Sequence, residues 1–232
     1  AREYAGAAGV YVQSLTGGGG AAWNAKAQFP AASTLKLAIA VTVLAEHSGV
    51  PPPGSSVHGL LQSMIARSDN ASANALEVWL AGSTSAGSRR VNSLMRSIGL
   101  VDSEMYGGYE LRTLSGRIPV RVEQQPAFGY GKRTSAFDMA SLLRAIWLAS
   151  GTQGPLREAQ SGFTAADGRY LVWLLAHVSD DPKLDRAREG NPGVVVLHKA
   201  GWLDTARHDA GLVFWRGGVF VAGVMTWSSR GA

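Results

Sequence analysis

Apolar and polar residues alternate near the start of the chain and again near its end. The alternation predicts strands over residues 10–15 and 22–29, joined by a glycine-rich turn at 17–20. Near the other end, segments rich in Val, Phe and Trp predict three more strands, at residues 194–199, 210–216 and 219–227. Gly217 and Gly218 are placed to make a tight turn between the last two.

Between these segments, apolar residues recur with the spacing of helices. The spacing predicts a long helix over residues 33–47 and shorter ones over 60–67, 71–79, 88–98, 135–150 and 170–177. Residues 101–134 have no persistent period and contain several glycines and prolines, which predicts a long loop. A loop of this length in a compact domain is usually functional or mobile.

Strands at both ends and helices between them predict one antiparallel sheet, assembled from the two ends of the chain, with an all-helical lobe inserted. The expected fold class is therefore α/β (α+β). Residues 1–50 and 190–232 would form the sheet-containing subdomain, with the helix at 33–47 at the lobe interface. Residues 51–189 would form the helical subdomain, which carries the long loop at 101–134.

Composition narrows the classes of function. The 232 residues are 46% hydrophobic, enough for a sizeable core, and no apolar run approaches the ~20 residues that cross a bilayer. The net charge of +5 comes from scattered basic residues, which argues against nucleic-acid binding and is compatible with anionic substrates. The absence of cysteine excludes disulfides, thiolate metal sites and a cysteine nucleophile. The histidines lack metal-ligand spacing, and neither a metal nor a cofactor is expected.

The first candidate for chemistry is the segment Ser33-Thr34-Leu35-Lys36, at the start of the long predicted helix. Positions i and i+3 share a helix face, so the Lys36 amine can lie against the Ser33 hydroxyl. A serine hydroxyl becomes a good nucleophile when a neighbouring base takes its proton, and a lysine with a lowered pKa can be that base. The alternative is a serine that caps the helix, followed by an exposed lysine.

A second motif, Ser68-Asp69-Asn70, falls in the short connection between two predicted helices. A hydroxyl on such a loop can pass a proton to a leaving nitrogen, and an amide side chain can hold a substrate amide. The alternative is a polar turn that only starts the next helix.

The third motif, Lys199-Ala200-Gly201, lies at the end of a predicted strand and is followed by Trp202. A lysine there can hold a substrate carboxylate or act on Ser68, and a glycine lets a substrate approach the strand backbone closely. The alternative is simply a strand that ends in a turn.

The three motifs are each weak alone, but their order and their expected placement on helix, loop and strand are specific. Together they resemble the signature of class A β-lactamases and penicillin-binding proteins, the β-lactamase/transpeptidase-like superfamily, over essentially the whole chain. The layout of strands, helical lobe and strands is similar to that of the family. Residues 134–143 and 207–213 also resemble the family's helix after its omega loop and its strand after Lys-x-Gly.

The resemblance implies a serine hydrolase that acts through an acyl-enzyme on β-lactam-type amides, as class A β-lactamases do. Ser33 would be acylated, and Lys36 would accept its proton or belong to the proton relay. Ser68 would pass a proton to the departing nitrogen. Asn70 would bind the acylamide side chain, and Lys199 would support Ser68 and attract the substrate carboxylate.

The resemblance also implies where the substrate is held. The backbone N–H groups of Ser33 and Trp202 would form the oxyanion hole, beside Gly201. Ala200 stands where the family has Thr or Ser, so a hydroxyl that binds the carboxylate is missing. The carboxylate would instead depend on Lys199, Thr205 or Arg207, and an arginine can clamp a carboxylate with two hydrogen bonds.

A second departure concerns hydrolysis of the acyl-enzyme. Class A β-lactamases carry a Glu-x-x-Leu-Asn string whose glutamate activates water, and residues 101–134 contain no such string. Glu110 and Glu104 are the possible deacylation bases; the alternative is that both are solvated loop carboxylates. Without a base, the chain would be a penicillin-binding D-alanyl-peptidase or esterase with slow deacylation, or a module that binds β-lactams or wall fragments without turnover.

The family usually adds a helix before the first strand and another after the last, whereas the strands predicted here lie close to both ends. Either those helices were trimmed, or an uncovered sheet face seeks a partner; otherwise a monomer is expected. The expected partner is a small-molecule β-lactam or a cell-wall peptide, with no nucleic acid and no membrane span. We expect an exported protein of the periplasm, cell envelope or medium.

Overall fold

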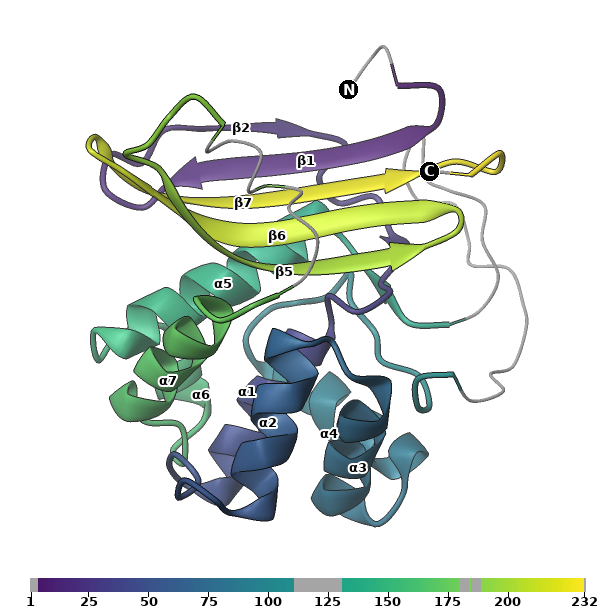
Figure 1. Ribbon diagram of the computed structural model, residues 1–232, viewed down its shortest axis with the longest axis vertical. Helices are drawn as coiled ribbons and strands as arrows, with labels where there is room; N and C mark the ends of the chain where they lie inside the picture. Colours follow the sequence, from purple (N-terminus) through teal and green to yellow (C-terminus); the bar gives the residue numbers. More distant parts are fainter. Residues whose placement is uncertain (1–3, 111–130, 180–183, 185–188, 232) are drawn as a thin grey trace.

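A sheet and a set of helices form two layers (Figure 1). The structure, a computed structural model, describes residues 4–110, 131–179, 184 and 189–231. Within these residues the strands of the main sheet come from the two ends of the chain and the helices from its middle, as the sequence predicts. The described residues contain no helix that is both long and apolar enough to cross a bilayer.

The main sheet has five antiparallel strands in the order β2-β1-β7-β6-β5. The first and last strands of the chain, β1 and β7, pair along the whole length of β1, so the sheet joins the two ends (Figure 1). The bounds are β1 Ala7–Ser14, β2 Gly20–Trp23, β5 Val195–Leu203, β6 Ala206–Trp215 and β7 Gly218–Trp227. β5 lies at one edge, and its position there determines what can approach the motif that it carries.

The predicted strand at 22–29 is wrong in its second half. Asn24 takes a left-handed conformation, with φ 47°, which Asn tolerates better than most residues, and the chain leaves the sheet there. The chain extends again as β3 (Phe29–Pro30), which pairs with β4 (Arg133–Thr134) in a separate two-stranded sheet. The segment before the first motif is thereby fixed to the segment that follows the long loop.

Polar caps and apolar faces define the helices. Five of them follow a Ser, Asp or Thr whose side chain accepts a hydrogen bond from a backbone N–H in the first turn, so four begin one to five residues before the apolar period predicts. The exception is α5, predicted from residue 135, which begins one residue later. The sequence missed α6, a five-residue helix with proline in its first turn. The bounds are α1 Lys36–His47, α2 Ser56–Ala66, α3 Asn70–Ala81, α4 Thr84–Ser97, α5 Ala136–Ser150, α6 Pro155–Ala159 and α7 Ala165–Leu175.

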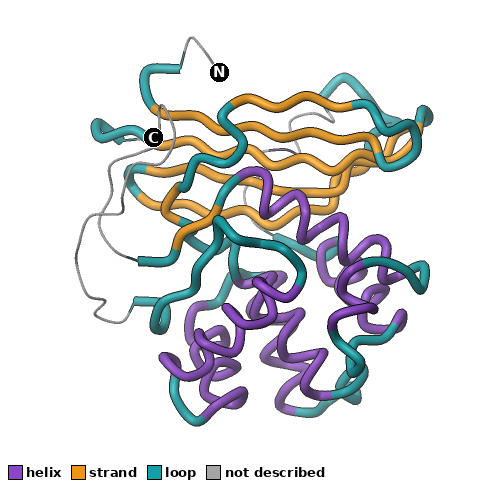
Figure 2. Tube along the Cα trace, turned by 180° about the vertical axis from the view of Figure 1, so that it is seen from behind, coloured by secondary structure: helices purple, strands orange, loops and turns teal. Residues whose placement is uncertain are grey.

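Two helices form the centre of the helical layer. α5 lies directly against β7, β6 and β1, and Figure 2 shows it beneath the sheet from behind. α1 is surrounded by α2, α3, α4 and α7, and its residues from Lys36 to Leu44 are all buried. Because α1 is buried along most of its length, a charged side chain in its first turn needs polar partners there.

Candidate active site

The chain enters α1 through a tight turn that contains Ser33. The helix begins at Lys36, so the expectation that Ser33 caps it is wrong. Instead, Lys36 N donates to Ser33 O at 3.2 Å and Leu37 N to Thr34 O at 3.2 Å, the i to i+3 pattern of a 3₁₀ turn. Side chains three residues apart eclipse in such a turn, and Lys36 Nζ donates to Ser33 Oγ at 3.0 Å.

The Lys36 side chain is fully buried, and oxygen atoms from the second motif surround its ammonium group. It donates to the Ser68 carbonyl and to Asn70 Oδ1, and it lies 3.5 Å from Ser68 Oγ. It also lies 4.6 Å from the centre of the Tyr109 ring, a favourable distance for a cation and an aromatic face. The structure therefore brings Ser33, Lys36, Ser68 and Asn70 together.

The second motif both starts a helix and places polar groups beside Lys36. Asp69 caps α3, where its side chain accepts from Ser72 N at 2.7 Å, and these hydrogen bonds with Ser72 lower the pKa of Asp69. Ser68 adopts φ 58°, a left-handed conformation unusual for serine. This conformation coincides with the placement of both Ser68 oxygens near Lys36.

The third motif lies within β5 and not at its end, so the predicted strand is too short. A Cβ atom built on Gly201 would lie 2.9 Å from Ser33 N and 3.0 Å from Thr34 N. Only a glycine fits so close to the turn before α1, and β5 is an edge strand whose alternate backbone groups face away from the sheet. Lys199 is fully buried and donates to Ala200 O at 3.0 Å.

The structure does not bring Arg207 beside Ser33. Gly201 pairs with His208 across the sheet and Trp202 pairs with Arg207. Because side chains alternate faces along a strand, Trp202 and Arg207 point to the face opposite Gly201. The Arg207 guanidinium donates to the carbonyls of Leu203 and Ala206 in its own hairpin, and its role as a carboxylate clamp stays a prediction.

The other residues expected to recognise the substrate lie close to this hairpin. Thr205 falls in the turn between β5 and β6, and its carbonyl accepts from Ser228 N at 2.9 Å. The Trp202 side chain is 60% exposed, and its backbone directly follows Gly201. Trp202 N–H thus belongs to the part of β5 that approaches Ser33.

The two candidate glutamates lie in different surroundings. Asn70 Nδ2 donates to Glu110 Oε1 at 2.7 Å, which attaches Glu110 to the group around Lys36. Glu104 instead forms an ion pair with Arg133 and a β-bridge with the same residue. Of the two, only Glu110 is brought to the candidate site.

Sequence reasoning missed several side chains around Glu110. Asn74 holds the backbone of Tyr109 in both directions, accepting from Tyr109 N at 2.6 Å and donating to Tyr109 O at 2.9 Å. Asn74 follows Asn70 by one helical turn on α3. This i, i+4 spacing of two asparagines could have indicated a polar helix face that holds a neighbouring segment. Lys132 lies 4.4 Å from the centre of the Tyr109 ring.

Two titratable groups near this loop have shifted pKa values. Burial raises the pKa of Glu77 to about 7, although Ser88 and Lys132 oppose the shift. Burial lowers the pKa of Lys132, which the negative charge of Glu77 opposes. Among the residues that the structure describes, no group of three or more His, Cys, Asp or Glu could hold a metal ion.

A comparison with known families follows from this arrangement. A model of the beta-lactamase enzyme family matches residues 1–49 and 46–231, nearly the whole sequence. The chain belongs to the beta-lactamase enzyme family. No curated protein matches the sequence.

The beta-lactamase family assignment agrees with the solved structures that are similar to this chain. A β-lactamase from Desulfarculus baarsii has a TM-score of 0.73 at 19% identity, with 98% of this chain and 85% of that chain covered. PBP-A has a TM-score of 0.72 at 20% identity, with 97% and 83% covered. A β-lactamase from Streptosporangium roseum has a TM-score of 0.71 at 17% identity, with 98% and 86% covered. At these identities the likeness establishes the fold.

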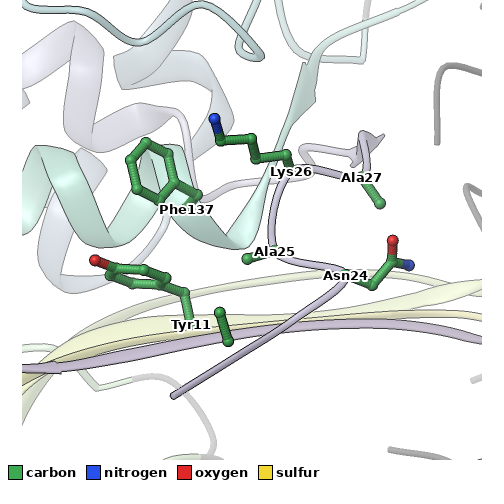
Figure 3. A pocket seen from close by; sticks show the side chains of 7 residues that line it. Tyr11, Asn24, Ala25, Lys26, Ala27 and Phe137 are labelled. Atoms are coloured by element: carbon green, nitrogen blue, oxygen red, sulfur yellow. The ribbon is translucent and has the colours of Figure 1, made fainter. Parts of the chain in front are cut away.

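This member of the beta-lactamase family also has a cavity of about 390 Å³ that lies apart from the three motifs (Figure 3). Its walls come from β1, β2, the segment after β2 and the start of α5, and its lining is Tyr11, Ala22, Asn24, Ala25, Lys26, Ala27 and Phe137. Lys26 Nζ lies 5.3 Å from the centre of the Phe137 ring. None of the motif residues lines this cavity, so we assign it no part in the candidate site.

Proposed function

We propose that this chain is a serine hydrolase of class A β-lactamase type, which opens β-lactam amides through an acyl-enzyme on Ser33. One observation carries the proposal: the buried Lys36 ammonium group donates a hydrogen bond to Ser33 Oγ at 3.0 Å. The same group also contacts Ser68 Oγ and Asn70 Oδ1. A hydroxyl, an adjacent amine and a second hydroxyl form the proton path that acyl transfer needs.

In the acylation step, Ser33 Oγ attacks the lactam carbonyl carbon while the neutral form of Lys36 takes the hydroxyl proton. The negative oxygen of the tetrahedral intermediate is stabilised by the N–H groups of Ser33 and Trp202; losing one such donor costs ~3–4 kcal/mol. The carbon–nitrogen bond then breaks as Ser68 gives its proton to the nitrogen and regains one from Lys36. The result is an ester on Ser33.

In the deacylation step, Glu110 takes a proton from a water molecule that attacks the ester carbonyl. The ester bond breaks, and the proton that Glu110 took up passes to Ser33 Oγ, so that both groups return to their starting forms. The hydrogen bond between Asn70 and Glu110 supports this role, since it ties the carboxylate to the residue that contacts Lys36. Glu110 is exposed, so water can reach its carboxylate.

A second candidate function keeps the same nucleophile but deacylates slowly, as a penicillin-binding D-alanyl-peptidase or esterase. A PBP-A variant solved as an acyl-enzyme complex with penicillin G has a TM-score of 0.69 at 19% identity to this chain. The absence of a Glu-x-x-Leu-Asn string from residues 101–134 also favours this candidate. A module that binds β-lactams without turnover is the third possibility.

Intact mass spectrometry after mixing with penicillin G separates these candidates. We expect one penicillin mass per chain that appears and then disappears, and no adduct in Ser33→Ala. Ser85→Ala, which changes an exposed serine on α4, is the matched control and should behave as the wild type. A long-lived adduct supports the second candidate, and one acylation that is never reversed supports the third. An adduct that persists in Ser33→Ala would refute the proposal.

We also propose that the protein acts outside the cytoplasm, where β-lactams and cell-wall peptides occur. The absence of cysteine is compatible with an oxidising compartment. Fractionation of cells that express the full-length gene, with a cytoplasmic marker enzyme as reference, tests this placement.

A further inference from the structure

Residues 105–110, called the strap here, connect Met105 to the candidate base Glu110 without regular secondary structure. The carbonyls of Met105 and Tyr109 accept hydrogen bonds from Asn92 and Asn74, each at 2.9 Å. Side chains therefore hold the strap near both of its ends, in place of the backbone hydrogen bonds that a helix or strand would supply.

Lys132 holds the middle of the strap. Its ammonium group donates to Gly108 O at 2.6 Å and to Tyr106 O at 3.2 Å, and it contacts the Tyr109 ring. Hydrogen bonds from a charged donor are roughly twice as strong as neutral ones. One side chain thus fixes two carbonyls and one ring within four residues of Glu110.

A buried carboxylate lies behind this contact. Glu77 is fully buried on α3, its Oε1 atom accepts from Ser88 Oγ at 2.7 Å, and Ser88 Oγ also lies 3.2 Å from Gly107 O. Asn70, Asn74 and Glu77 recur at i, i+4 and i+7, so they lie on one face of α3. That face presents an amide to Glu110, an amide to Tyr109 and a negative charge towards Lys132.

We propose that Lys132 is a positioning residue for deacylation, which keeps the strap in the conformation that places Glu110 beside Asn70. This inference rests on the proposed function. Ser33 receives its hydrogen bond from Lys36 within the turn before α1, and the Tyr109 ring of the strap lies against the Lys36 ammonium group without being part of that hydrogen bond. Lys132 should therefore matter for deacylation and much less for acylation.

The test is Lys132→Met, which keeps an unbranched side chain and removes the ammonium group. Stopped-flow measurement with a chromogenic cephalosporin gives the acylation rate constant, and decay of the adduct by intact mass spectrometry gives the deacylation rate constant. A displacement of about 1 Å in a catalytic group costs about 100-fold. We expect deacylation to slow by about 10- to 100-fold and acylation to change by less than about 3-fold.

Two further variants make the result specific. Lys26→Met is the matched control, because it removes an ammonium group that also lies over an aromatic ring, that of Phe137, in the cavity beside β1 and β2 (Figure 3). Lys132→Gln keeps one neutral donor group, so its deacylation rate constant should fall less than that of Lys132→Met. If Lys132→Met does not fold, the same comparison is made with Lys132→Gln.

A double-mutant cycle with Glu110→Gln distinguishes positioning from general structural damage. If Lys132 acts through Glu110, adding Lys132→Met to Glu110→Gln should slow deacylation no further. Additive losses, or parallel losses of acylation and deacylation, would overturn the assignment of Lys132 while leaving the proposed function intact. A wild-type chain that forms no adduct on Ser33 would overturn both.

Discussion

Replacing Gly201 by alanine tests whether the contact between β5 and the turn before α1 shapes the site. The new Cβ would meet backbone on two sides, at 2.9 Å from Ser33 N and 3.0 Å from Thr34 N. Gly201 has no left-handed φ, so the substitution introduces a steric conflict without backbone strain. To reach an ordinary contact of 3.4 Å, the two segments must separate by 3.4 − 2.9 = 0.5 Å.

That separation falls on the two N–H groups proposed for the oxyanion hole. Because a displacement of about 1 Å costs about 100-fold in rate, half of that displacement should cost about 10-fold, and loss of one donor would cost 10²- to 10³-fold. We expect the acylation rate constant of Gly201→Ala with a chromogenic cephalosporin to fall about 10- to 100-fold, or about 1.4 to 2.8 kcal/mol of transition-state stabilisation. Overpacking should also lower the free energy of unfolding by about 1–3 kcal/mol.

The matched control is Gly193→Ala, just before β5, where a Cβ would meet nothing within 4 Å and φ is not left-handed. Acylation by this variant should equal that of the wild type. Both variants are assayed well below their melting temperatures, so that unfolding does not imitate a catalytic loss. If Gly201→Ala is folded and acylates at the wild-type rate, the β5 contact does not define the oxyanion hole.

Three other variants follow from burial and space. Burial raises the pKa of Glu77 from 4.5 to about 7. The contribution of Glu77 to the free energy of unfolding is therefore full below pH 4.5, and about 3 kcal/mol of it is lost as the pH rises to 7. In urea unfolding measured over this pH range, Glu77→Gln should not show that loss of stability. Burial lowers the pKa of His208 from 6.5 to about 4, so its contribution is full above pH 6.5 and is lost as the pH falls to 4; the same titration of His208→Gln should lack that loss. Between pH 4.5 and 6.5 the two contributions change in opposite directions with pH. In that range the stability of Glu77→Gln should rise with pH, because only the His208 contribution remains. The stability of His208→Gln should fall with pH, because only the Glu77 contribution remains. Gly59→Ala, at an open position within α2, should stabilise the protein by about 0.5–1 kcal/mol and raise Tm by about 1–4 °C in a thermal scan; an unchanged or lower Tm would contradict it.

The sheet could be predicted from the sequence. When both ends of a chain carry alternating or continuous apolar runs, few arrangements other than one shared sheet bury those runs. Where the strands end could not be predicted. Asn24 leaves the sheet through a left-handed conformation, and β5 continues through Lys199 to Leu203 because its partner strand β6 begins early, at Ala206. Such boundaries depend on pairing with a distant segment, which local periodicity does not report.

Part of the site was predictable because it depends on short-range geometry. Ser33 and Lys36 meet within one turn, and Asp69 starts a helix wherever its partners lie. The face on which the Arg207 side chain lies could not be predicted, because distance along the sequence does not report strand pairing. Its pairing with Trp202 decides the face to which it points, and that face is opposite Gly201.

The strap was the least predictable part of the site, and the reason is physical. It has no period, and its hydrogen bonds come from side chains on helices and from Lys132, more than twenty residues further along the chain. Glu110 therefore looked like a solvated loop carboxylate, although Asn70 holds it. When side chains fix a loop backbone, the sequence pattern to look for lies in the segments that carry those side chains. Here that pattern is the row of polar positions Asn70, Asn74 and Glu77 on one face of α3.

The cost of burying the Lys36 ammonium group connects the fold to its chemistry. An ammonium removed from water costs several kcal/mol unless oxygen atoms converge on it, and those that do come from the turn at Ser33 and from Ser68 and Asn70 at the start of α3. Folding must bring these segments together to satisfy the charge, and the same arrangement places two hydroxyl groups on one amine. The contacts that make Lys36 tolerable in the core are thus the contacts that a proton relay requires. A chain that folds with Lys36 buried has therefore already brought the proposed nucleophile and the proposed relay together before any substrate binds.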